Sequence, residues 1–165
     1  MYPDDITELS RYLLELGRKK NLLVTTAESC TGGQIAGALV TIDGASLVFE
    51  RGFVTYSNEA KSECLGIAFD LIESFGAVSE EIAWAMAEGA IANSRADVSV
   101  SVTGVAGPGG GTPDKPVGLV HMAAARKGHK ILHQRHIFAG LDRAGVQEAT
   151  VRAALQLMIT QMEAD

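Results

Sequence analysis

The sequence predicts a single α/β domain over residues 1–165 with three layers, in which a mixed, mostly parallel sheet is flanked by helices. In the first hundred residues, short runs of strand character alternate with segments of helical period, as in parallel strands joined by helices. Near the C-terminus, two apolar runs are separated only by Lys127-Gly128, which indicates an antiparallel hairpin. A sheet with both kinds of connection is mixed.

The first elements of the chain alternate in type. Apolar residues recur at helical spacing over 6–16, which predicts a helix, and the β-branched run LLVTT at 22–26 predicts a buried strand. The loop AESCTGG then leads into a helix over 34–40. The run LVFERGFVTY at 47–56 predicts a second strand, in which Gly52 marks a bulge.

The remaining elements follow the same rules. Asn58 can cap a helix that carries Lys61, and Ser79 opens a longer, Ala-rich helix that extends to about residue 94. Three apolar runs predict strands, and a last segment with one apolar face predicts a helix. These segments are 98–102, 117–125 and 130–138 for the strands, and 143–162 for the helix.

The composition argues against several classes of protein. The net charge is −6, whereas binding to a nucleic-acid backbone needs clustered Lys and Arg. Two cysteines are too few for a disulfide framework, and no Cys/His spacing indicates a metal site. No run approaches the ~20 apolar residues of a membrane span, and the N-terminus does not resemble a signal peptide. We therefore expect a cytoplasmic protein with no nucleic-acid or membrane partner.

The loop AESCTGG, between a strand and a helix, is the first candidate site. Ligands of α/β folds gather there, where the next helix presents free backbone N–H groups. The Ser29 hydroxyl can attack a substrate, while those N–H groups hold the oxyanion that forms; a helix cap is the alternative role. Thr31 and Gln34 match the S/T-x-x-E/Q capping box, which would leave Ser29 free. Gly32 and Gly33 would let a substrate approach the backbone.

The second candidate is VTYSNEAK, which contains Tyr56 and Lys61. Lys61 falls in the first turn of a helix, where the positive end of the helix dipole and partial burial both lower a lysine pKa. A neutral Lys61 can accept the Ser29 proton, and Tyr56 could relay or orient it. Cys30 is a rival nucleophile, but a thiolate enzyme would need a His partner, and all four histidines lie on or between the late strands.

The third candidate is the glycine-rich loop 103–116, TGVAGPGGGTPDKP, directly after a strand. Backbone amides of such a loop can surround an anion or a ring, although a flexible crossover is equally compatible with the composition. The loop is neither a Walker motif nor a GxGxxG fingerprint. Arg143, at the start of the last helix, could bind a phosphate or lie on the surface.

Four separated blocks resemble the CinA C-terminal domain family: TTAESCTGG, RGFVTYSNEAK followed by LGI, GAVSEE, and VTGVAGPGGG followed by KPVGLV. The resemblance covers essentially the whole chain. It implies hydrolysis of the carboxamide of nicotinamide mononucleotide to nicotinate mononucleotide and ammonia, a pyridine-nucleotide salvage step, without metal or organic cofactor. It also implies a Ser–Lys amidase with catalytic Ser29 and Lys61, assisted by Tyr56.

The resemblance further implies polar positions around the substrate at Thr103 and Arg143. From the residues themselves we also expect backbone groups of the two loops to contact the substrate, at Thr31, Gly32, Gly33, Gly104 and Gly107. Either loop could supply the oxyanion hole. Three alternatives stay open: a non-catalytic pyridine-nucleotide-binding module, an amidase that acts on a different carboxamide, and a Cys30 thiol amidase. The Ala-rich helices over 82–92 and 146–158 offer surfaces through which a homodimer or higher homo-oligomer could form.

Overall fold

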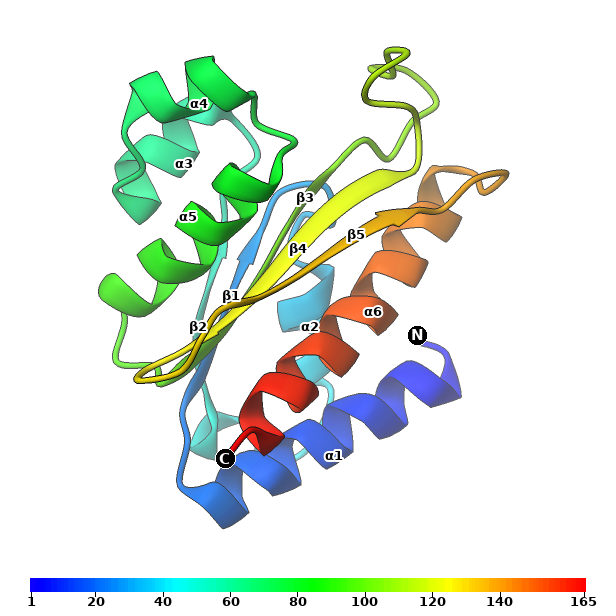
Figure 1. Ribbon diagram of the computed structural model, residues 1–165. Helices are drawn as coiled ribbons and strands as arrows, with labels where there is room; N and C mark the ends of the chain where they lie inside the picture. Colours follow the sequence, from blue (N-terminus) through cyan, green and yellow to red (C-terminus); the bar gives the residue numbers. More distant parts are fainter.

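A five-stranded sheet forms the middle layer of the computed structural model, which describes residues 1–165 (Figure 1). Its strands are β1 (Val24–Glu28), β2 (Phe49–Val54), β3 (Val98–Gly104), β4 (Leu119–Arg126) and β5 (Leu132–Ile137). The strand order is β2-β1-β3-β4-β5, and β1 pairs in parallel with both β2 and β3. The other two pairings are antiparallel, so β4 alone runs in the opposite direction. The expected mixed, mostly parallel sheet is confirmed.

Helices cover both faces of the sheet (Figure 1). They are α1 (Asp4–Lys20), α2 (Gln34–Val40), α3 (Asn58–Leu65), α4 (Phe69–Phe75), α5 (Glu80–Ala92) and α6 (Arg143–Glu163), with a 3-10 turn over Ala45–Leu47. α2 and α6 pack on one face, with α1 against both, whereas α5 packs on the other and carries α3 and α4. The seven-residue α4 is the one helix that the sequence did not predict. No helix is both long and apolar enough to span a membrane.

The two faces of β3 differ in chemistry, and this difference sets the layers. Its valines belong to the main core under α6. Alternate residues are hydroxyl side chains that donate hydrogen bonds to backbone carbonyls on the α5 side. These bonds, of 2.6 to 2.7 Å, join Ser99 to Ala87, Ser101 to Ala83 and Thr103 to Ala77. Small residues on both partners therefore let α5 lie close to the sheet.

The Ala-rich helices α5 and α6 bury their apolar faces within the chain. Ile82, Met86 and Ala90 of α5 are fully buried, as are Ala154 and Met158 of α6. The apolar faces of these two helices therefore belong to the core of their own chain, and pairing between copies stays a prediction.

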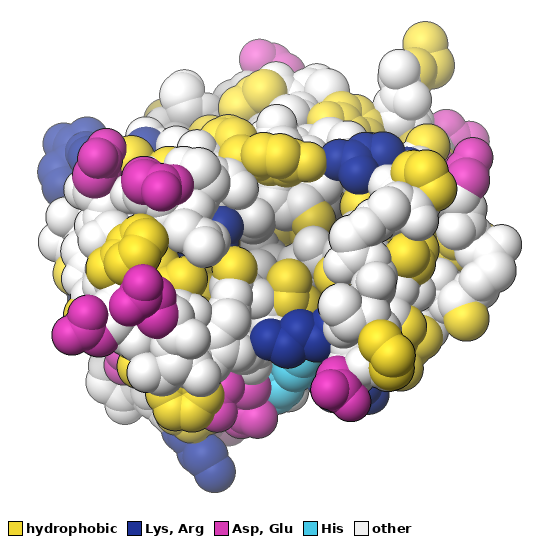
Figure 2. Space-filling view, turned by 90° about the horizontal axis from the view of Figure 1, so that it is seen from above, with side chains coloured by type: hydrophobic (Ala, Val, Ile, Leu, Met, Phe, Trp, Pro, Cys, Tyr) yellow, Lys and Arg dark blue, Asp and Glu magenta, His cyan; other side chains and the backbone are white.

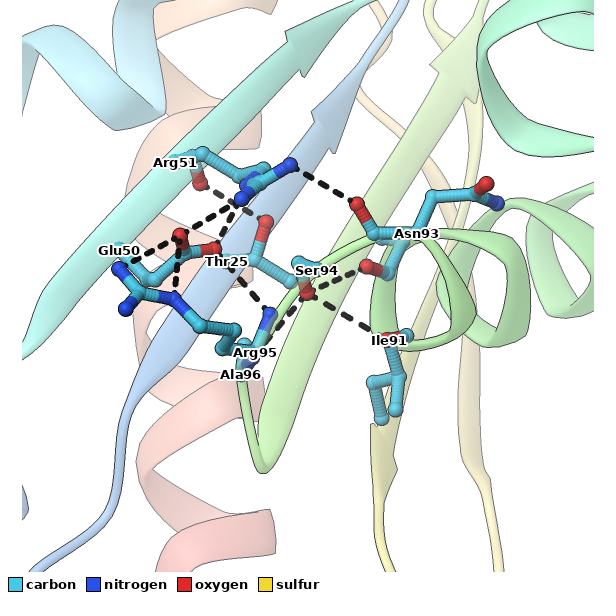
Figure 3. Close-up of polar contacts among 9 residues, drawn as sticks. Thr25, Glu50, Arg51, Ile91, Asn93, Ser94, Arg95 and Ala96 are labelled. Carbon is cyan, nitrogen blue, oxygen red and sulfur yellow. Dashed lines mark hydrogen bonds and ion pairs between the residues drawn. The ribbon is translucent and has the colours of Figure 1, made fainter.

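The bulge in β2 lies at Glu50 rather than at Gly52, because the pairing with β1 skips Glu50. The Glu50 carboxylate lies between Arg51 and Arg95 and accepts hydrogen bonds from both (Figure 3). The Arg51 guanidinium in particular lowers the pKa of Glu50 to about 2. This cluster joins β2 to the segment after α5 at the amino end of the parallel strands. The loops that follow β1, β2 and β3 lie at the opposite, carboxyl end of these strands.

Replacing Gly89 with alanine tests the close contact between α5 and α3. A Cβ at Gly89 would lie 2.4 Å from the Leu65 carbonyl oxygen, a backbone atom that cannot move aside. Alanine would gain about 1 kcal/mol of helix propensity, but overpacking outweighs it, and we expect the free energy of unfolding to fall by about 1–2 kcal/mol. Urea denaturation measures the change. Gly109→Ala is the control, because nothing lies within 4 Å of its Cβ position, and an equal loss in both variants would contradict the prediction.

Candidate active site

Ser29 and Lys61 meet at the carboxyl end of the parallel strands. Ser29 directly follows β1, and Lys61 lies in the first turn of α3, which follows β2. Because β1 and β2 are neighbours, the two loops lie side by side, and Lys61 Nζ donates a hydrogen bond of 3.0 Å to Ser29 Oγ. α3 is capped by Ser57 Oγ, which accepts from Ala60 N–H, and not by Asn58 as expected.

Lys61 is among the most buried side chains of the protein. Only 1% of its surface is exposed, and its amine has one further contact, a 3.0 Å hydrogen bond to the Thr55 carbonyl oxygen. Burial lowers the pKa of the Lys61 amine, because the charged form loses its hydration. No carboxylate forms an ion pair with it. Desolvation therefore favours the neutral amine, which is the form that can act as a base.

Glu28 is the site residue that sequence reasoning missed. It ends β1, is fully buried, and its Oε2 accepts hydrogen bonds from the Thr31 hydroxyl at 2.5 Å and from Gly33 N–H at 3.2 Å. The N–H groups of Ile35 and Ala36 donate to the same carboxylate. An anion at the first turn of α2 is favoured by the helix dipole. A glutamate between a strand and a Ser/Thr-Gly-Gly turn was the only signal that could have indicated this role.

The expected Thr31–Gln34 capping box is wrong. The N-cap of α2 is Gly33, with a positive φ and no side-chain cap, and Thr31 donates its hydroxyl proton to Glu28 instead of capping. The local motif fails because the Thr31 hydroxyl donates to Glu28, and because Gln34 N–H donates to the Thr31 carbonyl oxygen and not to its side chain. The other part of the expectation holds, since Ser29 makes no cap and keeps its hydroxyl for Lys61.

The backbone N–H groups after Ser29 divide into two sets. Gly32 N–H donates to the Ser29 carbonyl, and Gly33 N–H donates to Glu28. Cys30 and Thr31 keep N–H groups without an acceptor in the chain, and of these two residues only Cys30 lines the cavity beside Ser29. Cys30 N–H is therefore the one donor of this loop that is both unpaired and in the cavity beside Ser29.

Arg143 joins three loops across the cavity mouth. It is the first residue of α6, capped by Asp142, and one guanidinium nitrogen donates to the Gly107 carbonyl oxygen at 2.7 Å. The other donates to the Tyr56 hydroxyl at 2.8 Å. Tyr56 lies at the mouth with 62% of its surface exposed, and no hydrogen bond connects it to Ser29 or Lys61.

A cavity of about 280 Å³ contains most of the expected site. Seven expected residues line it: Ser29, Tyr56, Lys61, Thr103, Gly104, Gly107 and Arg143. Thr31, Gly32 and Gly33 do not. Two side chains of the lining are basic and none is acidic, although the chain has net charge −6. Viewed from this end, the molecule is hollowed near its centre, and Lys and Arg side chains border the hollow (Figure 2).

The remaining reactive side chains lie apart from this chemistry. The Cys30 thiol is packed in the core, and burial raises its pKa to about 12, so it stays protonated and poorly nucleophilic. No histidine lines the cavity; His121 and His133 stack on each other, and His136 stacks on Phe138. No group of three or more His, Cys, Asp or Glu side chains has the geometry of a metal site.

The fold and the site together define a three-layer α/β protein with a serine–lysine pair at the carboxyl end of its sheet. The CinA C-terminal domain model matches residues 6–162, and the chain belongs to that family. The crystal structure of the competence/damage inducible protein CihA from Agrobacterium tumefaciens is similar over 99% of both chains, with a TM-score of 0.96 and 47% identity.

Two relatives match over nearly their whole length. The chain is 42% identical over 161 residues to the nicotinamide-nucleotide amidohydrolase PncC of Escherichia coli, which covers 98% of this chain and 97% of that protein. It is 49% identical over 152 residues to PncC of Pseudomonas putida, covering 92% and 94%. Other relatives are longer: the chain spans 38% of the length of proteins from two Caldicellulosiruptor species, at 45% identity over 158 residues.

The Glu28 cluster is tested by Glu28→Gln. The amide keeps the size of the side chain but removes its charge and turns one acceptor oxygen into a donor that faces backbone N–H groups. We expect the free energy of unfolding to fall by about 1.5–3 kcal/mol, the usual effect of losing hydrogen bonds to a buried charge. Chemical denaturation measures it. Glu63→Gln, at an exposed carboxylate of α3, is the matched control and should be neutral; equal stability of both variants would rule out a structural role for Glu28.

Proposed function

We propose that this chain hydrolyses the carboxamide of nicotinamide mononucleotide to nicotinate mononucleotide and ammonia, with Ser29 as nucleophile and Lys61 as base. The observation that carries the proposal is the 3.0 Å contact between the Ser29 hydroxyl and a buried amine. The names of the two PncC relatives, which align over nearly the whole chain, support the substrate. The cavity supports it as well, because basic side chains without carboxylates suit a ligand that carries a phosphate.

The first half of the reaction acylates Ser29. Neutral Lys61 accepts the Ser29 proton on its lone pair as Oγ attacks the carboxamide carbon, and its remaining N–H groups keep the bond to the Thr55 carbonyl. The tetrahedral intermediate then collapses, the C–N bond breaks, and the Lys61 proton passes to the leaving nitrogen, which departs as ammonia. Because Nζ and Oγ are in direct contact, the transfer requires no intermediate proton carrier.

The second half restores the enzyme. Water attacks the acyl carbon while Lys61 takes one of its protons, and collapse of the second tetrahedral intermediate returns that proton to Ser29 Oγ and releases the carboxylate. In both halves the substrate oxygen carries negative charge. We assign its stabilisation to Cys30 N–H, the unpaired donor beside Ser29, an interaction commonly worth about 3 kcal/mol per donor. Gly32 and Gly33 are unsuited to this role, because their N–H groups already have acceptors.

The setting of the enzyme follows from the same chemistry. The proposed substrate and products are small intracellular metabolites, and both cysteines are free thiols, as in a reducing cytoplasm. We therefore propose a cytoplasmic enzyme with a small-molecule nucleotide substrate. Formation of a homodimer or higher homo-oligomer stays a prediction, which light scattering tests.

Substitution of the two central residues tests the reaction. We expect wild-type protein to release ammonia from nicotinamide mononucleotide, and Ser29→Ala and Lys61→Met to lower kcat by more than about 10³-fold, because neither nucleophile nor base is replaceable by water. Circular dichroism checks that both variants fold.

Cys30→Ala is the control, because it removes the thiol but keeps the backbone N–H, and it should retain activity close to that of the wild type. Inactive Cys30→Ala together with active Ser29→Ala would establish the thiol mechanism. Nucleotide binding without ammonia release by the wild type would establish a binding module, or an amidase for another carboxamide.

The pH dependence tests the ionisation of Lys61. Catalysis needs the neutral amine, so kcat/KM should rise with pH to a plateau, with an apparent pKa below the ~10.4 of an exposed lysine, since burial lowers the Lys61 pKa. Initial rates between about pH 6 and 10 give the profile. A rate that falls as pH rises through this range would mean that Lys61 acts in its charged form.

The lowered pKa of Lys61 also predicts the direction in which the free energy of unfolding changes with pH. In the pH window between the lowered folded pKa and the ordinary lysine value, the unfolded chain binds a proton that the folded site does not, so stability rises with pH. Lys61→Met should remove this dependence, which denaturation at several pH values measures.

A further inference from the structure

We propose that Tyr56 is a substrate-binding residue whose ring stacks on the cationic pyridinium of the substrate, and that it does not relay a proton. The inference rests on the proposed function, because nicotinamide mononucleotide carries its carboxamide on a positively charged ring. Tyr56 is the only aromatic residue that lines the cavity, and no other aromatic ring stacks on it. More than half of its surface is exposed, so one face of the ring is available to a ligand.

The hydrogen bonds of Tyr56 argue against a relay. Its hydroxyl accepts from Arg143, which is itself held by the Gly107 carbonyl on the far side of the mouth. The polar contacts of the Lys61 amine are Ser29 Oγ and the Thr55 carbonyl, and none is Tyr56. The hydroxyl therefore fixes the orientation of the ring, while the proton path lies deeper in the cavity. A ring held in this way loses little conformational entropy when a ligand binds.

The charges of the cavity explain why a ring is needed. The lining holds Lys61 and Arg143 but no carboxylate that could pair with a cation. Arg143 suits the phosphate of the substrate, but the same positive charge disfavours a pyridinium nearby. The face of an aromatic ring is electronegative and attracts an organic cation without adding a full negative charge that would repel the phosphate. Tyr56 is hydrogen-bonded directly to Arg143, so its ring lies next to the positive charge that suits the phosphate and disfavours the pyridinium.

Two substitutions separate stacking from relay. Tyr56→Phe keeps the ring and removes the hydroxyl; kcat should stay within a few fold of the wild type, with a modest rise in KM because the bond to Arg143 is lost. Tyr56→Leu removes the ring; KM should rise by about tenfold, the size of a partly desolvated cation–π contact, while kcat changes little. Ammonia release from nicotinamide mononucleotide gives both constants, and thermal unfolding shows whether the Leu variant folds.

A binding measurement isolates the ring charge. The reduced, dihydropyridine form of nicotinamide mononucleotide has the same carboxamide, ribose and phosphate but a neutral ring. In a Ser29→Ala background, which cannot turn over substrate, Tyr56→Leu should weaken binding of the oxidised form by about tenfold and leave the reduced form nearly unchanged. Calorimetry measures both ligands.

The outcomes distinguish the inference from the function on which it rests. A wild type that releases no ammonia contradicts the proposed function itself. An active wild type whose Tyr56→Phe variant loses most of its kcat at unchanged KM identifies Tyr56 as a proton relay and overturns the inference. Equal weakening of both ring forms by Tyr56→Leu also overturns it, because the contact would then be independent of charge.

Discussion

The site depends on one constraint, which is the burial of a lysine amine against a serine hydroxyl. An exposed Lys61 would carry a proton at neutral pH and could not accept another, whereas burial lowers its pKa. That burial is costly, and it depends on the placement of α3, which packs so closely on α5 that a Cβ at Gly89 would lie 2.4 Å from the Leu65 carbonyl oxygen. The packing of α3 on α5 therefore contributes to the burial of the Lys61 amine, and it links the stability of the fold to the proposed chemistry.

Glu28 is a second buried ionisable side chain, and its burial is compensated in a different way. Its carboxylate is compensated by four hydrogen-bond donors, so it needs no basic partner. This arrangement also limits the N–H groups that remain for a substrate, because Glu28 binds those of Gly33, Ile35 and Ala36, whereas Cys30 N–H has no acceptor in the chain.

Much of this organisation could be predicted from the sequence, because the relevant rules are local. Alternating runs gave the strand and helix types, and Lys127-Gly128 gave the hairpin. The two loops indicated Ser29 and Lys61 as candidates, and the resemblance singled them out as a pair. Their contact follows from the adjacency of β1 and β2, which a separation of 32 residues in the sequence does not reveal. The Thr31 cap was wrong because the Thr31 hydroxyl donates to Glu28, a contact that no local motif indicates. The bulge lies at Glu50, whose carboxylate is bound by two arginines, and not at Gly52.

Net charge is the property that predicted least about the cavity. A value of −6 argues against a nucleic-acid partner, yet the cavity lining is basic, because the acidic residues are elsewhere or are neutralised locally, as Glu28 is by a helix terminus and Glu50 by arginines. The field at a buried site is set by the few charges nearest to it in a medium of low dielectric constant, and distant surface charges are screened. Arg143 therefore determines the sign of the cavity mouth, and its bonds to Tyr56 and Gly107 fix where that charge lies.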